Sequence, residues 1–144
     1  MSDPFGLERF VAAQDHDGTY DAALAELRGG RKRSHWMWFV FPQIAGLGQS
    51  PISRRYAIRS LAEAEAYLAH PVLGPRLIEA ASVVKGVRGT AEDIFGGIDA
   101  MKLRSSMTLF ARADPTNPVF AEVLDAYFGG KPDEATERLL DQSG

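Results

Sequence analysis

The feature that most constrains the fold of this chain is a series of apolar patterns with a helical period. In each of them apolar residues recur three or four positions apart, which places their side chains on one face of an α-helix. Capping residues or Xaa-Pro steps open these segments, and glycines such as Gly29-Gly30 end several of them. The pattern predicts an all-α fold with helices that start near these residues: Asp3, Thr19, Ser60, His70, Thr90, Asp99, Asn117 and Asp133.

The helices are expected to form one compact domain over residues 1–144. A chain of 144 residues has the commonest domain size, and it can bury roughly 68–70% of the surface that its unfolded form exposes. The sequence has no internal repeat, no low-complexity tract and no linker long enough to separate domains. We therefore expect a core that needs neither disulfides nor a metal ion to stabilise it.

One segment does not follow the helical period. Residues 36–41 are six apolar residues in a row, and Pro42 ends the run. Periodicity cannot separate a buried strand from a buried helical turn at this length. No second strand-like run is present to pair with it, so we expect a short helical or irregular core segment. Residues 44–53, which follow, are predicted to form a glycine-rich loop.

Composition excludes several classes of site. The chain has no cysteine, and its three histidines form no metal-binding pair, so we expect no metal and no cofactor. A formal net charge of −3 argues against nucleic-acid binding, which relies on a basic surface. No apolar run approaches the ~18 residues of a membrane span, and the N-terminus lacks the pattern of a secretory signal. We therefore expect a cytoplasmic protein with no membrane segment.

Lys102 is the residue whose predicted position most needs an explanation. It lies on the stripe of the predicted helix 99–112 that also carries these residues: Ile98, Leu103, Ser106, Leu109 and Phe110. Lysine is rarely buried without a partner, because desolvating its charge is costly. Lys102 could therefore line an anion pocket, with Ser105 and Ser106 donating hydrogen bonds. Alternatively, it could extend to solvent or pair internally with Asp99 or another acid.

A second candidate cluster follows the basic residues 31–33. His35, Trp36 and Trp38 come directly after them, so an aromatic ring could stack on a nucleotide while His35 acts as an acid–base group. Alternatively, the basic residues form a solvated turn and the tryptophans fill the core. Gln43 is a further ligand-binding candidate, although its amide could instead satisfy backbone groups of the loop. Gly46-Leu47-Gly48 lacks the third glycine of a dinucleotide fingerprint.

Several segments together resemble one known family. They are Arg9-Phe10-Val11, residues 35–43 (HWMWFVFPQ), Gly46-Leu47-Gly48, residues 69–74 (AHPVLG), Ile94-Phe95-Gly96 and residues 102–110 (KLRSSMTLF). Over nearly the whole chain the sequence is similar to the domain-of-unknown-function 1810 family. The resemblance implies a small, mainly α-helical bacterial domain and implies no activity or substrate. Members are sometimes labelled calpastatin-like, but calpastatin acts through segments that fold on binding, whereas this composition predicts a chain that buries its own core.

Three hypotheses for the function follow from these residues. The first is a site for a small anionic or nucleotide-like ligand, with Lys102, Ser105, Ser106, His35, Trp36, Trp38 and Gln43 as ligand-binding residues. The second is a protein-interaction or regulatory module without catalysis, in which the tryptophans and nearby arginines form an exposed surface. The third is single-stranded nucleic-acid binding, which the net charge disfavours. The sequence names no reaction and no protein partner.

Overall fold

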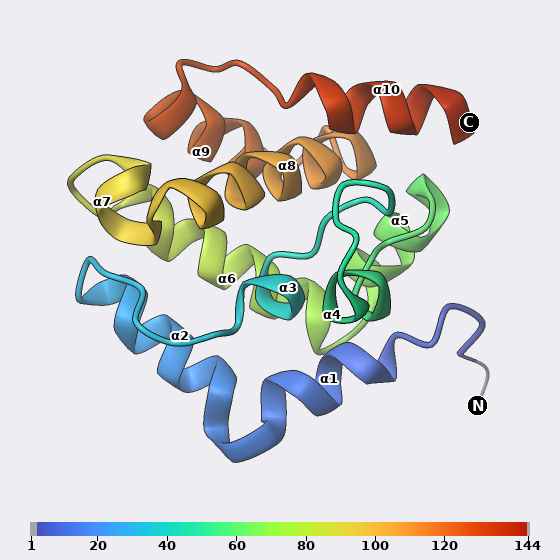
Figure 1. Ribbon diagram of the computed structural model, residues 1–144, viewed down its shortest axis with the longest axis horizontal. Helices are drawn as coiled ribbons and strands as arrows, with labels where there is room; N and C mark the ends of the chain where they lie inside the picture. Colours follow the sequence, from blue (N-terminus) through green and yellow to red (C-terminus); the bar gives the residue numbers. More distant parts are fainter. Residues whose placement is uncertain (1–2, 144) are drawn as a thin grey trace.

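The computed structural model describes residues 3–143, and within them it contains helices and no strand (Figure 1). The helices are α1 (Glu8–Asp15), α2 (Thr19–Arg28), α3 (Met37–Val40), α4 (Pro51–Arg55), α5 (Leu61–Ala69), α6 (Leu73–Lys85), α7 (Ala91–Phe95), α8 (Gly97–Ala113), α9 (Val119–Phe128) and α10 (Glu134–Ser143), and a short 3-10 helix, η1 (His16–Gly18), joins the first two. The prediction of one compact all-α domain is confirmed.

Two long helices organise the core. Helix α8 packs against α5, α7, α9 and α10, while α6 packs against α2, α5 and α9. In Figure 1, α8 and α6 run through the middle of the molecule, with α9 and α10 on one side and α1 and α2 on the other. The residues of α8 that face this core, Leu103, Met107 and Phe110, are fully buried. At Gly46, the loop between α3 and α4 approaches Leu139 of α10.

Side-chain hydrogen bonds mark several of the helix starts. The Ser60 hydroxyl accepts a hydrogen bond from Glu63 N, and Thr90 and Asp93 form a reciprocal capping box at the start of α7. His70 Nδ1 accepts from the backbone of Val72 at 3.1 Å, which fits its predicted place at a helix junction. Helix α1 starts later than predicted, at Glu8, because Asp3 caps a preceding turn by accepting from Leu7 N and Glu8 N.

The apolar run forms the short helix α3, as predicted for residues 36–41. The predicted glycine-rich loop 44–53 is wrong at its C-terminal end, because α4 begins at Pro51 and Ser50 caps it. The loop is also paired with the chain beyond α4. Ile58 N donates to the Gln43 carbonyl at 2.8 Å, and Ala45 N donates to the Ile58 carbonyl at 2.8 Å, which makes an isolated parallel bridge. This bridge holds two loop segments side by side.

Candidate functional site

Lys102 forms an ion pair inside the protein. Its Nζ lies 3.0 Å from one oxygen of Asp99, and Lys32 Nζ lies 2.8 Å from the other oxygen. The Lys102 side chain is 19% exposed and that of Lys32 is 8% exposed. Burial alone would raise the pKa of Asp99, but the hydrogen bonds from the two ammonium groups outweigh it and lower that pKa. Lys102 thus makes the internal pair that the alternative interpretation required.

The ion-paired cluster also contacts both tryptophans. Lys102 Nζ lies 4.1 Å from the centroid of the Trp38 ring, and Lys32 Nζ lies 5.1 Å from that of Trp36. These distances fall within the range of cation–π interactions. Because two lysines share one carboxylate, the cluster has one positive charge in excess.

The buried face of α8 begins later along the helix than the sequence predicts. Ile98, which was expected to share that face, is 75% exposed, whereas Ala100 and Leu103 are buried. Periodicity assigns residues to a face, but it cannot say where along the axis neighbouring helices begin to cover that face. The prediction for Ile98 is therefore wrong.

The two serines of α8 have different environments. The Ser105 hydroxyl lies 3.1 Å from the Met101 carbonyl and 3.2 Å from an oxygen of Asp133, which itself accepts from Thr136 N at the start of α10. Ser105 therefore supports a helix cap. Ser106 is fully buried, and its hydroxyl has no hydrogen-bond partner among residues 3–143.

Within residues 3–143, His35 and Trp36 do not line a pocket together with Lys102. His35 is exposed and lines a shallow hollow together with His16 and Arg55. Trp36 is buried in the core, and its indole Nε1 donates to Glu26 at 2.9 Å. Of the seven predicted ligand-binding residues, the structure brings only Trp38 and Gln43 together in a well-defined pocket.

Glu26 fixes the segment that leads into Trp36. One of its oxygens accepts from Arg33 N, Ser34 N and the Trp36 indole, and the other accepts from the Ser34 hydroxyl at 2.6 Å. Burial alone would raise the pKa of Glu26, but these hydrogen bonds lower it to about 2. The chain between α2 and α3 is thus held by one ionised carboxylate.

We expect Glu26→Gln to lower the free energy of unfolding by ~2 kcal/mol at pH 7, because the amide replaces an ionised acceptor of four hydrogen bonds. A carboxylate whose folded-state pKa is depressed stabilises the protein above its unfolded pKa of about 4.3. That contribution is lost as the pH falls toward 2. Urea unfolding at pH 7 and pH 3 should therefore show a smaller difference between wild type and variant at pH 3. An equal difference at both pH values would contradict this assignment.

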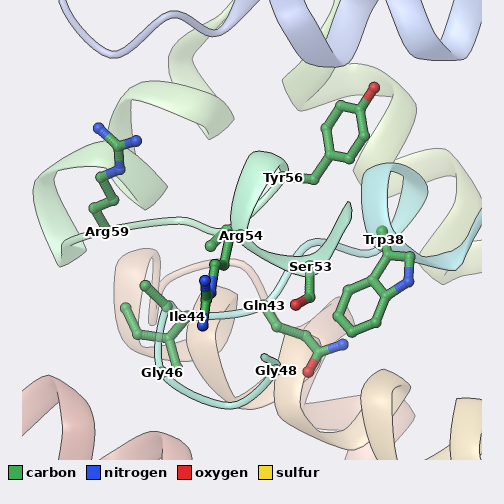
Figure 2. Close-up of a pocket in the computed structure, with 11 residues that line it drawn as sticks. Trp38, Gln43, Ile44, Gly46, Gly48, Ser53, Arg54, Tyr56 and Arg59 are labelled. Carbon is green, nitrogen blue, oxygen red and sulfur yellow. The ribbon is translucent and has the colours of Figure 1, made fainter. Parts of the chain in front are cut away.

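A partly enclosed pocket with a volume of about 220 Å³ lies between the α3–α4 loop and the segment around α4 (Figure 2). The residues that line it and carry functional groups are Trp38, Gln43, Ser53, Arg54, Tyr56 and Arg59. Figure 2 shows the Gln43 amide beside the Trp38 ring, with Ser53 close to both. Ser53 is buried, while Trp38 and Tyr56 are half-buried.

Close backbone contacts shape this pocket. The parallel bridge between Ile44 and Ile58 fixes one side of it. A Cβ atom on Gly48 would lie 2.6 Å from Ser53 Cβ and 3.2 Å from the Trp38 ring, so only glycine lets the loop approach α4 this closely. At the tip of the loop, Gly46 has a φ of +106° and packs against Leu139 of α10. The loop is therefore held at its tip by α10 and at Gly48 by α4.

A buried ion pair holds the other wall of the pocket. Arg9 Nη2 lies 2.9 Å from Glu63, whose side chain is 2% exposed. Arg9 also donates to the carbonyls of Arg55 at 2.7 Å and Ala57 at 2.9 Å, while Glu63 accepts from Arg59 N at 3.0 Å. The wall at residues 55–59 is thus attached to both α1 and α5.

The rim of the pocket carries positive charge. Arg54 and Arg59 are exposed, and neither forms an ion pair with a carboxylate in the described part of the chain. Among the described residues, the Arg54 guanidinium donates one hydrogen bond, to Gln49 at 3.3 Å. The sequence indicated a basic spot at Arg54-Arg55 but gave no signal for Arg59, because Arg59 joins the site only through the bridge at Ile58. No group of residues suited to a metal ion occurs among residues 3–143.

Comparison with known proteins places the chain in a family. The sequence profile described as protein of unknown function (DUF1810) matches residues 4–140. The chain belongs to the DUF1810 family. The DUF1810 fold described above is similar to the crystal structure of the conserved hypothetical protein Rv1873 from Mycobacterium tuberculosis, with 55% identity and a TM-score of 0.93. The match covers 96% of this chain and 99% of that one. The comparison with curated proteins gave no match.

The resemblance inferred from the sequence motifs is thereby confirmed. In this DUF1810 chain, no helix within residues 3–143 has the length and apolar character to cross a membrane. The family description names no activity.

Proposed function

We propose that this DUF1810 chain binds a small anionic molecule in the pocket between the α3–α4 loop and α4. The observation that supports this most is a pair of arginines, Arg54 and Arg59, that line a partly enclosed pocket without a carboxylate partner among the described residues. Arginine is the side chain best suited to hold carboxylate or phosphate, because its planar group donates two parallel hydrogen bonds. An anion in the pocket would supply the charged partner that the Arg54 guanidinium lacks, and the exposed Arg59 side chain, which Figure 2 shows turned away from the pocket, would reach the same anion by rotating toward it.

The remaining lining suits a molecule with an apolar part. Trp38 supplies a half-buried aromatic wall, and Gln43 and Ser53 supply a small number of polar groups, whereas the Tyr56 ring points away and packs against Phe10 and Phe39. An aromatic wall with few polar groups is typical of ligand sites. The cluster of Lys32, Asp99 and Lys102 contacts Trp38 and has one positive charge in excess, which adds to the positive potential at this wall.

The lining supports binding better than catalysis. The pocket contains no histidine and no carboxylate to act as a general base, and His35 lines a different hollow. Of the ligand-binding residues predicted from the sequence, Trp38 and Gln43 line this pocket. We assign the anion contacts to Arg54 and Arg59 instead of Lys102. The alternative of a protein-interaction surface built on the tryptophans loses Trp36, because that residue is buried.

We expect small carboxylates or phosphates to raise the melting temperature in a thermal-shift screen. A ligand at 100 times its dissociation constant stabilises the folded state by ~2.7 kcal/mol, which corresponds to roughly 5–10 °C for a domain of this size. The double variant Arg54→Ala/Arg59→Ala should weaken binding at least ~tenfold, because each charge-assisted hydrogen bond contributes ~1.5 kcal/mol or more.

The matched control is Arg88→Ala. Arg88 is also exposed and has no carboxylate partner in the described part of the chain, but it lies at the end of α6, away from this pocket. It should keep wild-type affinity for the same ligand. A ligand whose affinity changes equally in both variants binds elsewhere, and a screen without any stabilising anion would remove the proposal.

A further inference from the structure

The Gln43 side chain has an unusual environment for a buried amide. It is 6% exposed, and its Nε2 is buried without a hydrogen-bond partner. Its Oε1 accepts no hydrogen bond from the described residues and, unlike Nε2, is accessible to solvent. A buried polar group without a partner costs about 1–3 kcal/mol, so natural proteins rarely retain one without a reason. Gln43 lines the proposed pocket, where a ligand could satisfy it.

The backbone holds this amide in place. The Gln43 carbonyl accepts from Ile58 N at 2.8 Å, and Ala45, two residues later, donates to the Ile58 carbonyl. The backbone of the residue is therefore fixed, while the amide at the tip of the side chain has no hydrogen-bond partner among the described residues. In Figure 2 the amide lies beside the Trp38 ring and close to Ser53. The pocket thus has an unpartnered donor and acceptor next to a flat aromatic face.

An amide whose nitrogen and oxygen both lack hydrogen-bond partners can pair with only one kind of group. It donates through Nε2 and accepts through Oε1, so it pairs with a group that has an acceptor and a donor side by side. Cyclic amides and the edges of nucleobases have this pattern, and glutamine reads nucleobases through two such hydrogen bonds. A plain aromatic ring would leave the amide without partners inside the pocket, which is unfavourable.

We infer that the pocket selects a small heterocyclic anion rather than anions in general. The ring edge of the ligand, a cyclic amide or an equivalent donor–acceptor pair, binds the Gln43 amide. The ring face lies against Trp38, and a carboxylate or phosphate on the ring or its substituent binds Arg54 and, after rotation of its side chain toward the pocket, Arg59. This inference rests on the proposed function and adds to it the chemical class of the ligand.

The test compares ring anions with and without this edge. Orotate has a cyclic amide edge and a carboxylate, while benzoate has the carboxylate alone; uridine 5′-monophosphate and phenyl phosphate extend the comparison to phosphate. The first pair also differs in ring polarity and the second in the ribose, so the variant Gln43→Met assigns the preference to the amide. Affinities come from titration of ¹⁵N-labelled protein by NMR. In each pair the heterocycle should bind at least ~tenfold more tightly, because two hydrogen bonds contribute ~1.4 kcal/mol or more. The side-chain amide resonances of Gln43, assigned by their loss in Gln43→Met, should shift only with the heterocycles.

Gln43→Met separates recognition from a structural role. It removes the amide and keeps the side-chain length, so the heterocycles should fall to the affinity of their plain counterparts, whose own binding stays unchanged. Its melting temperature without ligand should equal or exceed that of the wild type, because an unpartnered buried amide is removed. Loss of stability in this variant would instead indicate a structural amide and overturn the inference.

The outcomes also distinguish this inference from the proposed function. If orotate and benzoate bind equally, and Arg54→Ala/Arg59→Ala abolishes both, the anion site stands and the selection by Gln43 is wrong. If the heterocycles bind more tightly and Gln43→Met removes the preference, both stand, and the tighter of the two heterocycles identifies the preferred anion. If none of the four probes binds at millimolar concentration, the heterocyclic class is wrong; the anion site is then judged separately by the broader thermal-shift screen.

Discussion

Replacement of Gly74 with alanine is expected to lower the free energy of unfolding by about 3 kcal/mol or more, and the melting temperature by roughly 10 °C. Gly74 lies in the first turn of α6, and a Cβ atom there would lie 2.0 Å from the backbone carbonyl oxygen of Leu68 in α5. A backbone atom cannot rotate away as a side chain can, so the two helices would have to separate. This cost exceeds the ~1 kcal/mol that alanine gains over glycine from helix propensity.

Gly97→Ala is the matched control for this prediction. Gly97 is the first residue of α8, and a Cβ atom at that position meets no heavy atom within 4 Å. Its stability should stay within ~0.5 kcal/mol of the wild type or increase slightly. Circular dichroism during thermal unfolding measures both variants. Similar melting temperatures for Gly74→Ala and Gly97→Ala would show that α5 and α6 do not need this close approach.

The second large effect is expected from Arg9→Met, which should destabilise the protein by ~3–5 kcal/mol. The substitution leaves Glu63 as a buried carboxylate without its cation. It also removes the hydrogen bonds to the carbonyls of Phe5, Arg55 and Ala57. Urea unfolding measures the change, and the wall of the pocket at residues 55–59 should become more accessible to proteolysis.

Two further variants show whether the buried charge causes this effect. Addition of Glu63→Gln to Arg9→Met should recover part of the lost stability, because it removes the uncompensated charge. Arg112→Met breaks an ion pair with Asp141 in which both residues are exposed, so it should cost less than ~1 kcal/mol. If Arg9→Met and Arg112→Met cost the same, the Arg9–Glu63 pair does not have the predicted importance.

The helices could be predicted from the sequence because their signals are local. Ser60 and Thr90 cap helices that start at the next residue, and the apolar spacing of Tyr20 and Leu24 places both in the core. The start of α4 was missed because it lies in a stretch with two glycines. Ser50 and Pro51 are nevertheless a capping residue and a proline at the first helical position, so the signal was present in the sequence.

The candidate site could be predicted only in part. The apolar surroundings of Trp38 and Gln43 singled them out, but the pocket also needs Arg59, which joins it through a bridge between residues 44 and 58. Lys102 was assigned to the correct helix, yet Lys32, which shares its carboxylate, comes from a distant part of the chain. Helical periodicity contains no information on such contacts, because they depend on how loops cross one another.

The two oxygens of Glu63 have a consequence for how the pocket behaves when it is filled. One oxygen binds Arg9 of α1, and the other accepts from the backbone of Arg59 in the pocket wall. Local opening of the first helix and release of that wall are therefore coupled equilibria, even though no residue of α1 lines the pocket. A ligand that binds the pocket and restrains Arg59 is therefore expected to slow amide hydrogen exchange in α1 as well.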